Sequence, residues 1–167
     1  MTRPRLVLVG PPGAGKTTVG TLVAARLGLA FRDTDADVEA TAGTSIADVF
    51  YAHGEEHFRA LERAAVATAL AEHDGVLSLG GGAVLAAETR ALLAGHHVVH
   101  LQVGLAAAAD RTGLSGTRPV LALNPRATLR TLLAERAPLY AEVATAVVDT
   151  DGRTPEDVAD DVVRSLP

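Results

Sequence analysis

The sequence contains no cysteine and no tryptophan, and aromatic residues make up only 3% of it. The absence of cysteine excludes disulfide bonds, thiolate metal sites and a cysteine nucleophile. With 48% hydrophobic and 21% charged residues, the composition is typical of a compact α/β protein with an aliphatic core rather than of a disordered chain. The formal net charge of −5 argues against a nucleic-acid partner and favours a small anionic ligand held by a few local cations.

Long hydrophobic runs are also missing. The apolar run before Gly10 is too short for a signal peptide or a membrane span, so we expect a cytoplasmic protein with no membrane partner. The 167 residues suit one domain, and no linker or internal repeat divides them. We therefore expect residues 1–167 to form a single domain that acts as a monomer.

Lysine is nearly absent as well, because only Lys16 among the 15 lysine and arginine residues is a lysine. Together with Gly10, Gly15 and Thr17, it satisfies the pattern G-x-x-x-x-G-K-[ST] of a phosphate-binding loop. In such a loop the backbone N–H groups surround a phosphate, the lysine reaches the β and γ phosphates and the hydroxyl ligates Mg²⁺. The alternative is an ordinary glycine-rich turn, but the flanking sequence favours the phosphate loop.

Short apolar runs alternate with helical patterns along the whole chain. Strands are predicted at 6–9, 76–79, 98–103 and 146–149, and helices at 16–27, 58–73, 86–95, 104–112, 126–137 and 155–165. Ser45 with Asp48, and Thr154 with Asp157, are typical helix starts. This alternation predicts an α/β fold with a central parallel sheet of about five strands flanked by helices. The irregular stretch 112–124 is predicted to be a mobile lid.

The class of phosphate-loop protein follows from what surrounds the loop. A GTPase normally carries Asn-Lys-x-Asp, which a chain with no lysine besides Lys16 lacks. Large mechanical ATPases usually place an aspartate after a long apolar strand, whereas residues 76–79 lead into Gly80, Gly81 and Gly82. A small-molecule kinase remains the best class.

Two carboxylates in the segment FRDTD at 31–35 are candidates for the chemistry. If residues 31–35 form a strand, Asp33 and Asp35 point to the same side at its carboxyl end, where ligands bind in open parallel sheets. A kinase needs one carboxylate near its metal and a group that orients or deprotonates the acceptor hydroxyl. A solvated acidic loop is an equally good interpretation of this segment taken alone.

Three arginines are candidates for binding negative charge. Arg59 has Glu62 three residues later on the same helix, where the carboxylate can fix the guanidinium. Arg118 lies in the irregular stretch, and Arg136 is expected to end a helix that Pro138 stops. Each alone is compatible with ordinary surface charge.

Further motifs accompany these residues: SIADVF at 45–50, GEEHFRALE at 54–62, LSLGGGAV at 77–84, RTG at 111–113, TRPVL at 117–121 and ERAPLYAEVA at 135–144. Together with the phosphate loop and DTD at 33–35, they make the sequence resemble the shikimate kinases, small kinases of the nucleoside-monophosphate-kinase type. The resemblance extends over almost the whole chain. It implies a P-loop kinase fold and Mg²⁺- and ATP-dependent phosphorylation of the 3-hydroxyl of shikimate, a step towards chorismate and the aromatic amino acids.

The resemblance also implies roles for individual residues. The ATP phosphates would bind Gly13, Ala14, Gly15, Lys16, Thr17 and Thr18, and the adenine would lie near Arg111, Arg153 and Pro155. Thr17 and Asp33 would serve the metal. Shikimate would contact Asp35, Arg59, Gly80, Gly81, Gly82 and Arg136, while Lys16, Asp35 and Arg118 would act in catalysis. Phe50 and Phe58 are candidate walls of the acceptor pocket, or plain core residues.

Two other functions remain open. The first is a related kinase that phosphorylates gluconate, which also combines hydroxyl groups with a carboxylate. A nucleotide-binding regulatory module without turnover is the second alternative, although Asp35 and the three arginines weigh against it. The six histidines suggest no metal site, because the helical pair His53 and His57 has no third ligand in the sequence.

Overall fold

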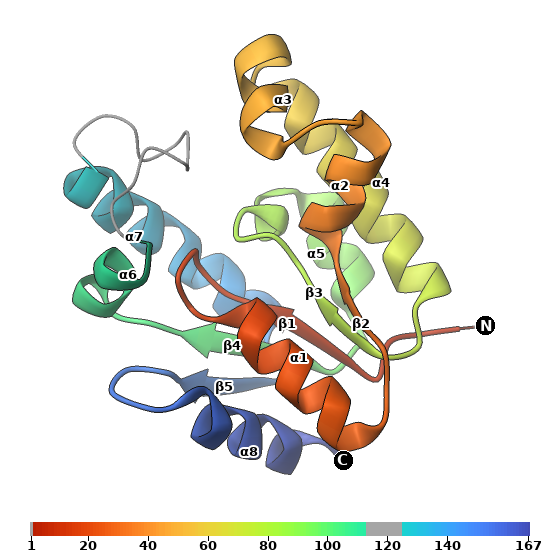
Figure 1. The fold of residues 1–167 in the computed structure, drawn as a ribbon, viewed down its shortest axis with the longest axis vertical. Helices are drawn as coiled ribbons and strands as arrows, with labels where there is room; N and C mark the ends of the chain where they lie inside the picture. Colours follow the sequence, from red (N-terminus) through yellow and green to blue (C-terminus); the bar gives the residue numbers. More distant parts are fainter. Residues whose placement is uncertain (1, 113–124) are drawn as a thin grey trace.

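The computed structural model describes residues 2–112 and 125–167, which contain one parallel sheet and eight α-helices. The strands are β1 (Leu6–Val9), β2 (Phe31–Asp33), β3 (Val76–Ser78), β4 (Val98–Gln102) and β5 (Ala146–Asp149). Their order across the sheet is β2-β3-β1-β4-β5, so β1 is the central strand (Figure 1). The predicted α/β fold with about five parallel strands is confirmed.

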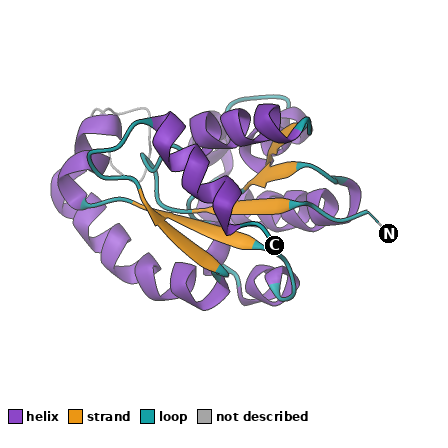
Figure 2. Cartoon of the chain, turned by 90° about the horizontal axis from the view of Figure 1, so that it is seen from below, coloured by secondary structure: helices purple, strands orange, loops and turns teal. Residues whose placement is uncertain are grey.

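Helices cover both faces of this sheet (Figure 2). They are α1 (Lys16–Leu27), α2 (Thr34–Ala42), α3 (Ile46–His53), α4 (Glu55–Glu72), α5 (Ala87–Leu93), α6 (Leu105–Thr112), α7 (Pro125–Val143) and α8 (Pro155–Ser165), with a short 3₁₀ helix at Ala83–Leu85. The predicted helix starts are confirmed at two of them. The hydroxyl of Ser45 accepts a hydrogen bond from Asp48 N–H, and that of Thr154 accepts one from Asp157 N–H, each at 3.1 Å.

The central strand shows why its sequence is apolar without alternation. Leu6 and Leu8 belong to the core that α1 and α8 cover, whereas Val7 and Val9 belong to the core that α4 and α5 cover. Successive side chains of a strand point to opposite faces, so both faces of β1 are buried. Because all five strands are parallel, their carboxyl ends lie at one edge, where the loops that follow them gather.

A third, smaller core lies outside the sheet. Val38 on α2, Val49 on α3 and Phe58 on α4 form a buried cluster of their own. In Figure 1, α3 and the adjoining end of α4 lie at the top, while the other end of α4 packs on the sheet. The parts of these helices that hold the small core form a wall beside the carboxyl ends of the strands.

The predicted strand over residues 31–35 is too long. β2 ends at Asp33, and Asp35 lies in the first turn of α2. The Asp33 carboxylate accepts a hydrogen bond from Asp35 N–H at 2.9 Å and so caps the helix, while Asp35 and Asp37 add negative charge to its first turn. Asp33 and Asp35 are thus related by a strand-to-helix turn and not by strand alternation.

Pro138 does not stop a helix. α7 continues through it to Val143, although a proline inside a helix lacks the backbone N–H and disturbs the preceding turn. The turn after Pro138 is held by tertiary packing, because Tyr140 is only 2% exposed and Leu139 and Val143 pack on the same core. As a consequence Arg136 and Tyr140 lie one turn apart on one face.

None of the helices in residues 2–112 and 125–167 has the length and hydropathy that crossing a membrane requires.

The histidines around β4 predict acid sensitivity. Burial lowers the pKa of His96, His97 and His100 from the ordinary value of 6.5, and the neighbouring charges of Arg3, Arg5 and Lys16, respectively, lower it further. The unfolded chain therefore binds protons more readily than the folded one. Their stabilising contribution is present above the unfolded pKa and is lost as the pH falls below it.

We expect His100→Gln to reduce this pH dependence, since glutamine does not titrate and His100 is only 8% exposed. The measurement is the free energy of unfolding in urea between about pH 8 and pH 5. The diagnostic result is a smaller slope of the free energy of unfolding against pH. A loss of stability that is equal at every pH reports only the lost contact between the His100 and Tyr140 rings. A slope equal to that of the parent protein would contradict the prediction.

Candidate active site

The phosphate loop joins β1 to α1 and depends on its glycines. Gly13 and Gly15 have φ values of 84° and 87°, a region that glycine adopts without strain. A Cβ atom on Gly10 would lie 2.5 Å from the backbone oxygen of Leu101, so this position has no room for a side chain. The loop thus leads directly into the amino terminus of α1, where backbone N–H groups favour an anion.

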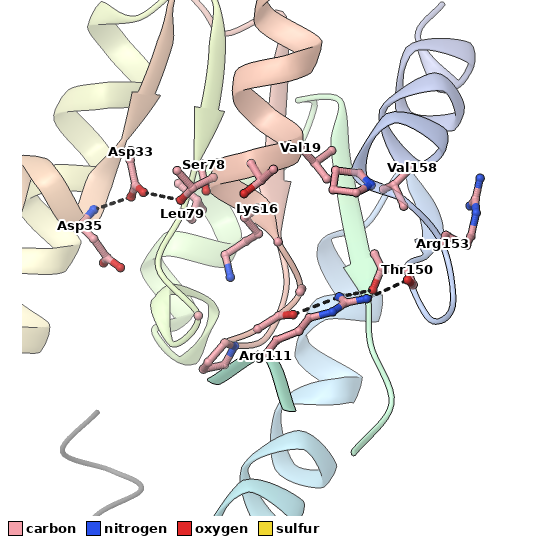
Figure 3. A pocket seen from close by; sticks show the side chains of 18 residues that line it. Lys16, Val19, Asp33, Asp35, Ser78, Leu79, Arg111, Thr150, Arg153 and Val158 are labelled. Carbon is pink, nitrogen blue, oxygen red and sulfur yellow. Dashed lines mark hydrogen bonds between the residues drawn. The ribbon is translucent and has the colours of Figure 1, made fainter. Parts of the chain in front are cut away.

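Lys16 lies at the first position of α1 and folds back over the loop. Its Nζ donates hydrogen bonds to the carbonyl oxygens of Gly10 at 2.7 Å and Pro11 at 3.1 Å. Its side chain lines a cavity of about 440 Å³. Figure 3 shows Lys16 among the side chains that line it. All the residues predicted to bind the nucleotide that the structure describes line this cavity: Gly13, Ala14, Gly15, Lys16, Thr17, Thr18, Arg111, Arg153 and Pro155.

The two residues predicted to serve a metal are neighbours. The Thr17 hydroxyl donates to Asp33 Oδ2 at 3.2 Å, and both residues line the same cavity. The other Asp33 oxygen is occupied by the helix cap on α2. A hydroxyl and a carboxylate next to a phosphate-binding loop are the oxygen donors that Mg²⁺ prefers, so these residues fit that ion.

A second cavity of about 380 Å³ adjoins the first. Three residues line both cavities, namely Pro12, Asp35 and Gly81. Phe50 and Phe58 form part of the second cavity, and Phe58 also belongs to the small core of α2, α3 and α4. Asp35 therefore stands at the junction of a phosphate-binding cavity and a separate pocket.

An ion pair on α4 forms one wall of the second cavity. Arg59 Nη1 donates to Glu62 Oε1 at 2.8 Å, and Arg59 Nε donates to Glu55 Oε2 at 3.3 Å. Glu62 is only 3% exposed, and its burial raises the pKa of the carboxyl group against the opposing effect of Arg59. The predicted (i, i+3) pair is present and fixes the direction of the Arg59 guanidinium.

The three glycines after β3 allow close contacts. A Cβ on Gly80 would overlap Asp35 Oδ1, and one on Gly82 would overlap the guanidinium of Arg59. Gly81 and Gly82 line the second cavity, while Gly80 is buried and its N–H donates to Thr34 Oγ1 at 3.3 Å. Two of the three predicted glycines, Gly81 and Gly82, therefore line the second cavity, whereas Gly80 does not.

Arg136 is a second arginine at this cavity. It lines the second cavity, is only 7% exposed and adds positive charge near Glu62. Its positive charge acts on the nearby Tyr140 hydroxyl, which donates to the Gly81 carbonyl at 2.5 Å. Burial raises the pKa of Tyr140 to about 12, so the hydroxyl keeps its proton.

The predicted lid and its arginine have no structural test. Apart from Thr112, the segment 112–124 lies outside the described residues, and so does Arg118.

Comparisons with known proteins bear directly on this arrangement. The family model for shikimate kinase matches residues 12–167. A shikimate kinase from Salinispora tropica is 63% identical over 164 residues, which are 98% of this chain and 98% of that protein.

The chain belongs to the shikimate kinase family. It is therefore an ATP-dependent kinase that phosphorylates an alcohol group. The structure of a shikimate kinase from Acinetobacter baumannii in complex with shikimate superimposes with a TM-score of 0.93 at 38% identity, covering 98% of this chain and 92% of that one. A gluconokinase from Sinorhizobium meliloti has a TM-score of 0.65 at 20% identity, with 98% and 91% covered, and shares the fold alone.

Two residues that contact or line these cavities were not predicted from the sequence. Tyr140 was hidden because Pro138 was expected to end the helix, although the spacing of four residues from Arg136 was the available signal. Thr150 lines the nucleotide cavity directly after β5 and accepts a hydrogen bond from Arg111. Its position at the carboxyl end of a strand was the only hint in the sequence.

We expect Gly82→Ala to disturb the second cavity of this shikimate kinase by displacing Arg59. Gly82 has φ −98°, which alanine accepts, so the effect is steric. The affinity for shikimate, the ligand of the Acinetobacter structure, should fall about tenfold, as expected for loss of one charged hydrogen bond. Calorimetric titration with shikimate and with ADP measures both affinities, and the ADP affinity should not change.

The variant Gly82→Ala/Arg59→Ala provides the control. If the new methyl group acts through Arg59, the double variant binds shikimate no more weakly than Arg59→Ala. Additive losses would show that Gly82 acts by another route.

Proposed function

We propose that this protein transfers the γ-phosphoryl group of ATP to the 3-hydroxyl of shikimate, giving shikimate 3-phosphate and ADP, in the route to chorismate and the aromatic amino acids. The observation that carries this proposal is the position of Asp35, which lines both the phosphate-binding cavity and the second pocket. Family membership and the similarity to a structure that holds shikimate support the choice of acceptor.

At the nucleotide end, the loop backbone and Lys16 hold the β and γ phosphates. The two carbonyl oxygens that contact Lys16 Nζ keep the ammonium group close to the loop. A compact ammonium suits this narrow place, whereas a planar guanidinium suits the carboxylate and adenine positions that arginines occupy. Arg111, Arg153 and Pro155 form the adenine end of the same cavity.

Mg²⁺ would be held by Thr17, with Asp33 supporting it through water. The ion would supply positive charge that offsets the charge of the phosphates. Thr17 and Asp33 lie within 3.2 Å of each other through their side-chain oxygens, which supports their joint role.

At the acceptor end, Arg59 and Arg136 bind the carboxylate of shikimate. Planar guanidinium groups suit paired contacts with a carboxylate, and the Arg59–Glu62 pair fixes one of them in advance. Asp35 then binds the acceptor hydroxyl, orients its oxygen toward the γ phosphorus and accepts the hydroxyl proton. Because phosphoryl transfer passes through a loose transition state, orientation by Asp35 contributes at least as much as proton removal.

The remaining parts of the proposal concern the whole chain. Residues 1–167 form one kinase domain with a lid at about 112–124, from which Arg118 contacts the transferred phosphoryl group and helps to exclude water. The enzyme acts as a cytoplasmic monomer, with neither nucleic acid nor a membrane as partner. The net charge of −5 supports a small anionic substrate.

An assay with paired acceptors tests the function. ADP release is measured with ATP and Mg²⁺ in the presence of shikimate or gluconate at equal concentration. We expect turnover with shikimate, and NMR of the product should locate the phosphate on the 3-hydroxyl. Turnover with gluconate alone would identify the other kinase, and ATP binding without turnover on either acid would identify a regulatory module.

Asp35→Asn should lower kcat by about a hundredfold or more, because the amide can neither accept the proton nor bind the acceptor hydroxyl as strongly as a carboxylate does. Affinity for ADP should stay unchanged, since the phosphate loop is intact. Asp37→Asn is the matched control two residues along α2, where the carboxylate pairs with Arg32 at 2.7 Å and lines neither cavity. Equal turnover in both variants would remove Asp35 from the chemical step.

A further inference from the structure

Thr150 is a buried polar residue that none of the proposed roles uses. It follows β5 directly and is only 2% exposed. Its N–H and its hydroxyl both donate to the carbonyl oxygen of Gln102 at the end of β4, each at 2.9 Å. The residue is therefore fixed to the rigid end of the sheet.

The guanidinium of Arg111 is bound to this residue by two hydrogen bonds. Arg111 Nη1 donates to Thr150 Oγ1 and Arg111 Nη2 donates to Thr150 O, each at 2.9 Å (Figure 3). Two parallel bonds from one guanidinium to one residue fix its plane as well as its position. Because the hydroxyl hydrogen is directed at Gln102 O, the rotation of the hydroxyl is fixed and its oxygen is left to accept from Arg111.

Arg111 also reaches the phosphate loop. Its Nη1 donates to the carbonyl oxygen of Gly13 at 3.1 Å, so one guanidinium connects the turn after β5 with the loop after β1. The same turn holds the other end of α6, where the Asp151 carboxylate accepts hydrogen bonds from Gly104 N–H at 3.0 and 3.1 Å. The helix that carries Arg111 is thus attached to this turn at both ends.

We propose that Thr150 is a positioning residue for the nucleotide: it holds the Arg111 guanidinium in the plane that receives the adenine and fixes the turn at 150–155 relative to the phosphate loop. This rests on the proposed binding of adenine beside Arg111. A flat guanidinium stacks on an aromatic ring only when its face is presented, and a side chain as flexible as arginine loses much conformational entropy if it must be ordered on binding. Because Thr150 already orders the Arg111 side chain, little of this conformational entropy remains to be lost when the nucleotide binds.

The test replaces the hydroxyl while keeping the shape of the side chain. Thr150→Val should weaken ADP binding about tenfold, since it removes one of the two hydrogen bonds to residue 150 that fix the plane of the guanidinium, while the bonds to the backbone oxygens of residues 150 and 13 remain. Thr150→Ser retains the hydroxyl and should restore ADP affinity to within about threefold of the parent value. Calorimetric titration with ADP measures each affinity, and shikimate affinity should stay constant in both variants.

Thr145→Val is the matched control for a lost threonine hydroxyl between the same two strands. Thr145 lies just before β5, at its other end, where its hydroxyl donates to His96 O and accepts from Val98 N–H, each at 3.1 Å. We expect this variant to leave ADP affinity unchanged. Thermal unfolding of all variants shows whether each is folded, and the serine variant keeps the test valid if valine impairs folding.

A double variant tests whether Thr150 acts through Arg111. Thr150→Val/Arg111→Ala should bind ADP with the same affinity as Arg111→Ala. The proposal is overturned if Thr150→Val, once shown to be folded, binds ADP as the parent does, or if the two losses add. Because ADP titration needs neither acceptor nor turnover, a failure of shikimate phosphorylation would refute the acceptor assignment while leaving this result intact.

Discussion

The buried ion pair between Glu62 and Arg59 is the interaction on which the acceptor half of the site depends. A carboxylate that is 3% exposed needs cationic partners, and breaking a buried ion pair costs about 3–5 kcal/mol. Arg59 is therefore held against Gly82, where a side chain would displace it. Arg136 adds a second positive charge near both Glu62 and the Tyr140 hydroxyl. One buried negative charge thus places two guanidinium groups before any acceptor arrives.

The phosphate loop contacts both halves of the site, the acceptor cavity with its arginines and the nucleotide cavity. On the acceptor side, the Tyr140 hydroxyl donates to the carbonyl oxygen of Gly81. Pro12 of the loop occupies the place where a Gly81 side chain would lie. On the other side Arg111 binds the carbonyl oxygen of Gly13. The two cavities consequently share one wall. Their relative position is set by two side chains that donate to backbone carbonyl oxygens, Tyr140 on Gly81 and Arg111 on Gly13.

The sequence was sufficient for the parts of the site that depend on local spacing. The phosphate loop, the Arg59–Glu62 pair and both helix caps follow from residues close together in the chain, and all are present. The prediction at Pro138 was wrong because local helix propensity was outweighed by burial of Tyr140, which only the tertiary fold reveals. Asp35 was placed on a strand because alternation was extended past the Asp33 cap. The contact of Thr150 with Arg111 joins residues 39 positions apart, and no local pattern announces it.

The use of one lysine has a practical consequence for chemical labelling. Lys16 holds the only side-chain amine in the sequence, and it lies in the phosphate loop beside the nucleotide cavity. Reagents that couple a dye or a solid support through amines therefore have just this residue and the chain terminus to react with. Amine chemistry becomes a direct probe of loop occupancy, and an attachment site placed elsewhere, such as an introduced cysteine in a chain that has none, leaves the loop untouched.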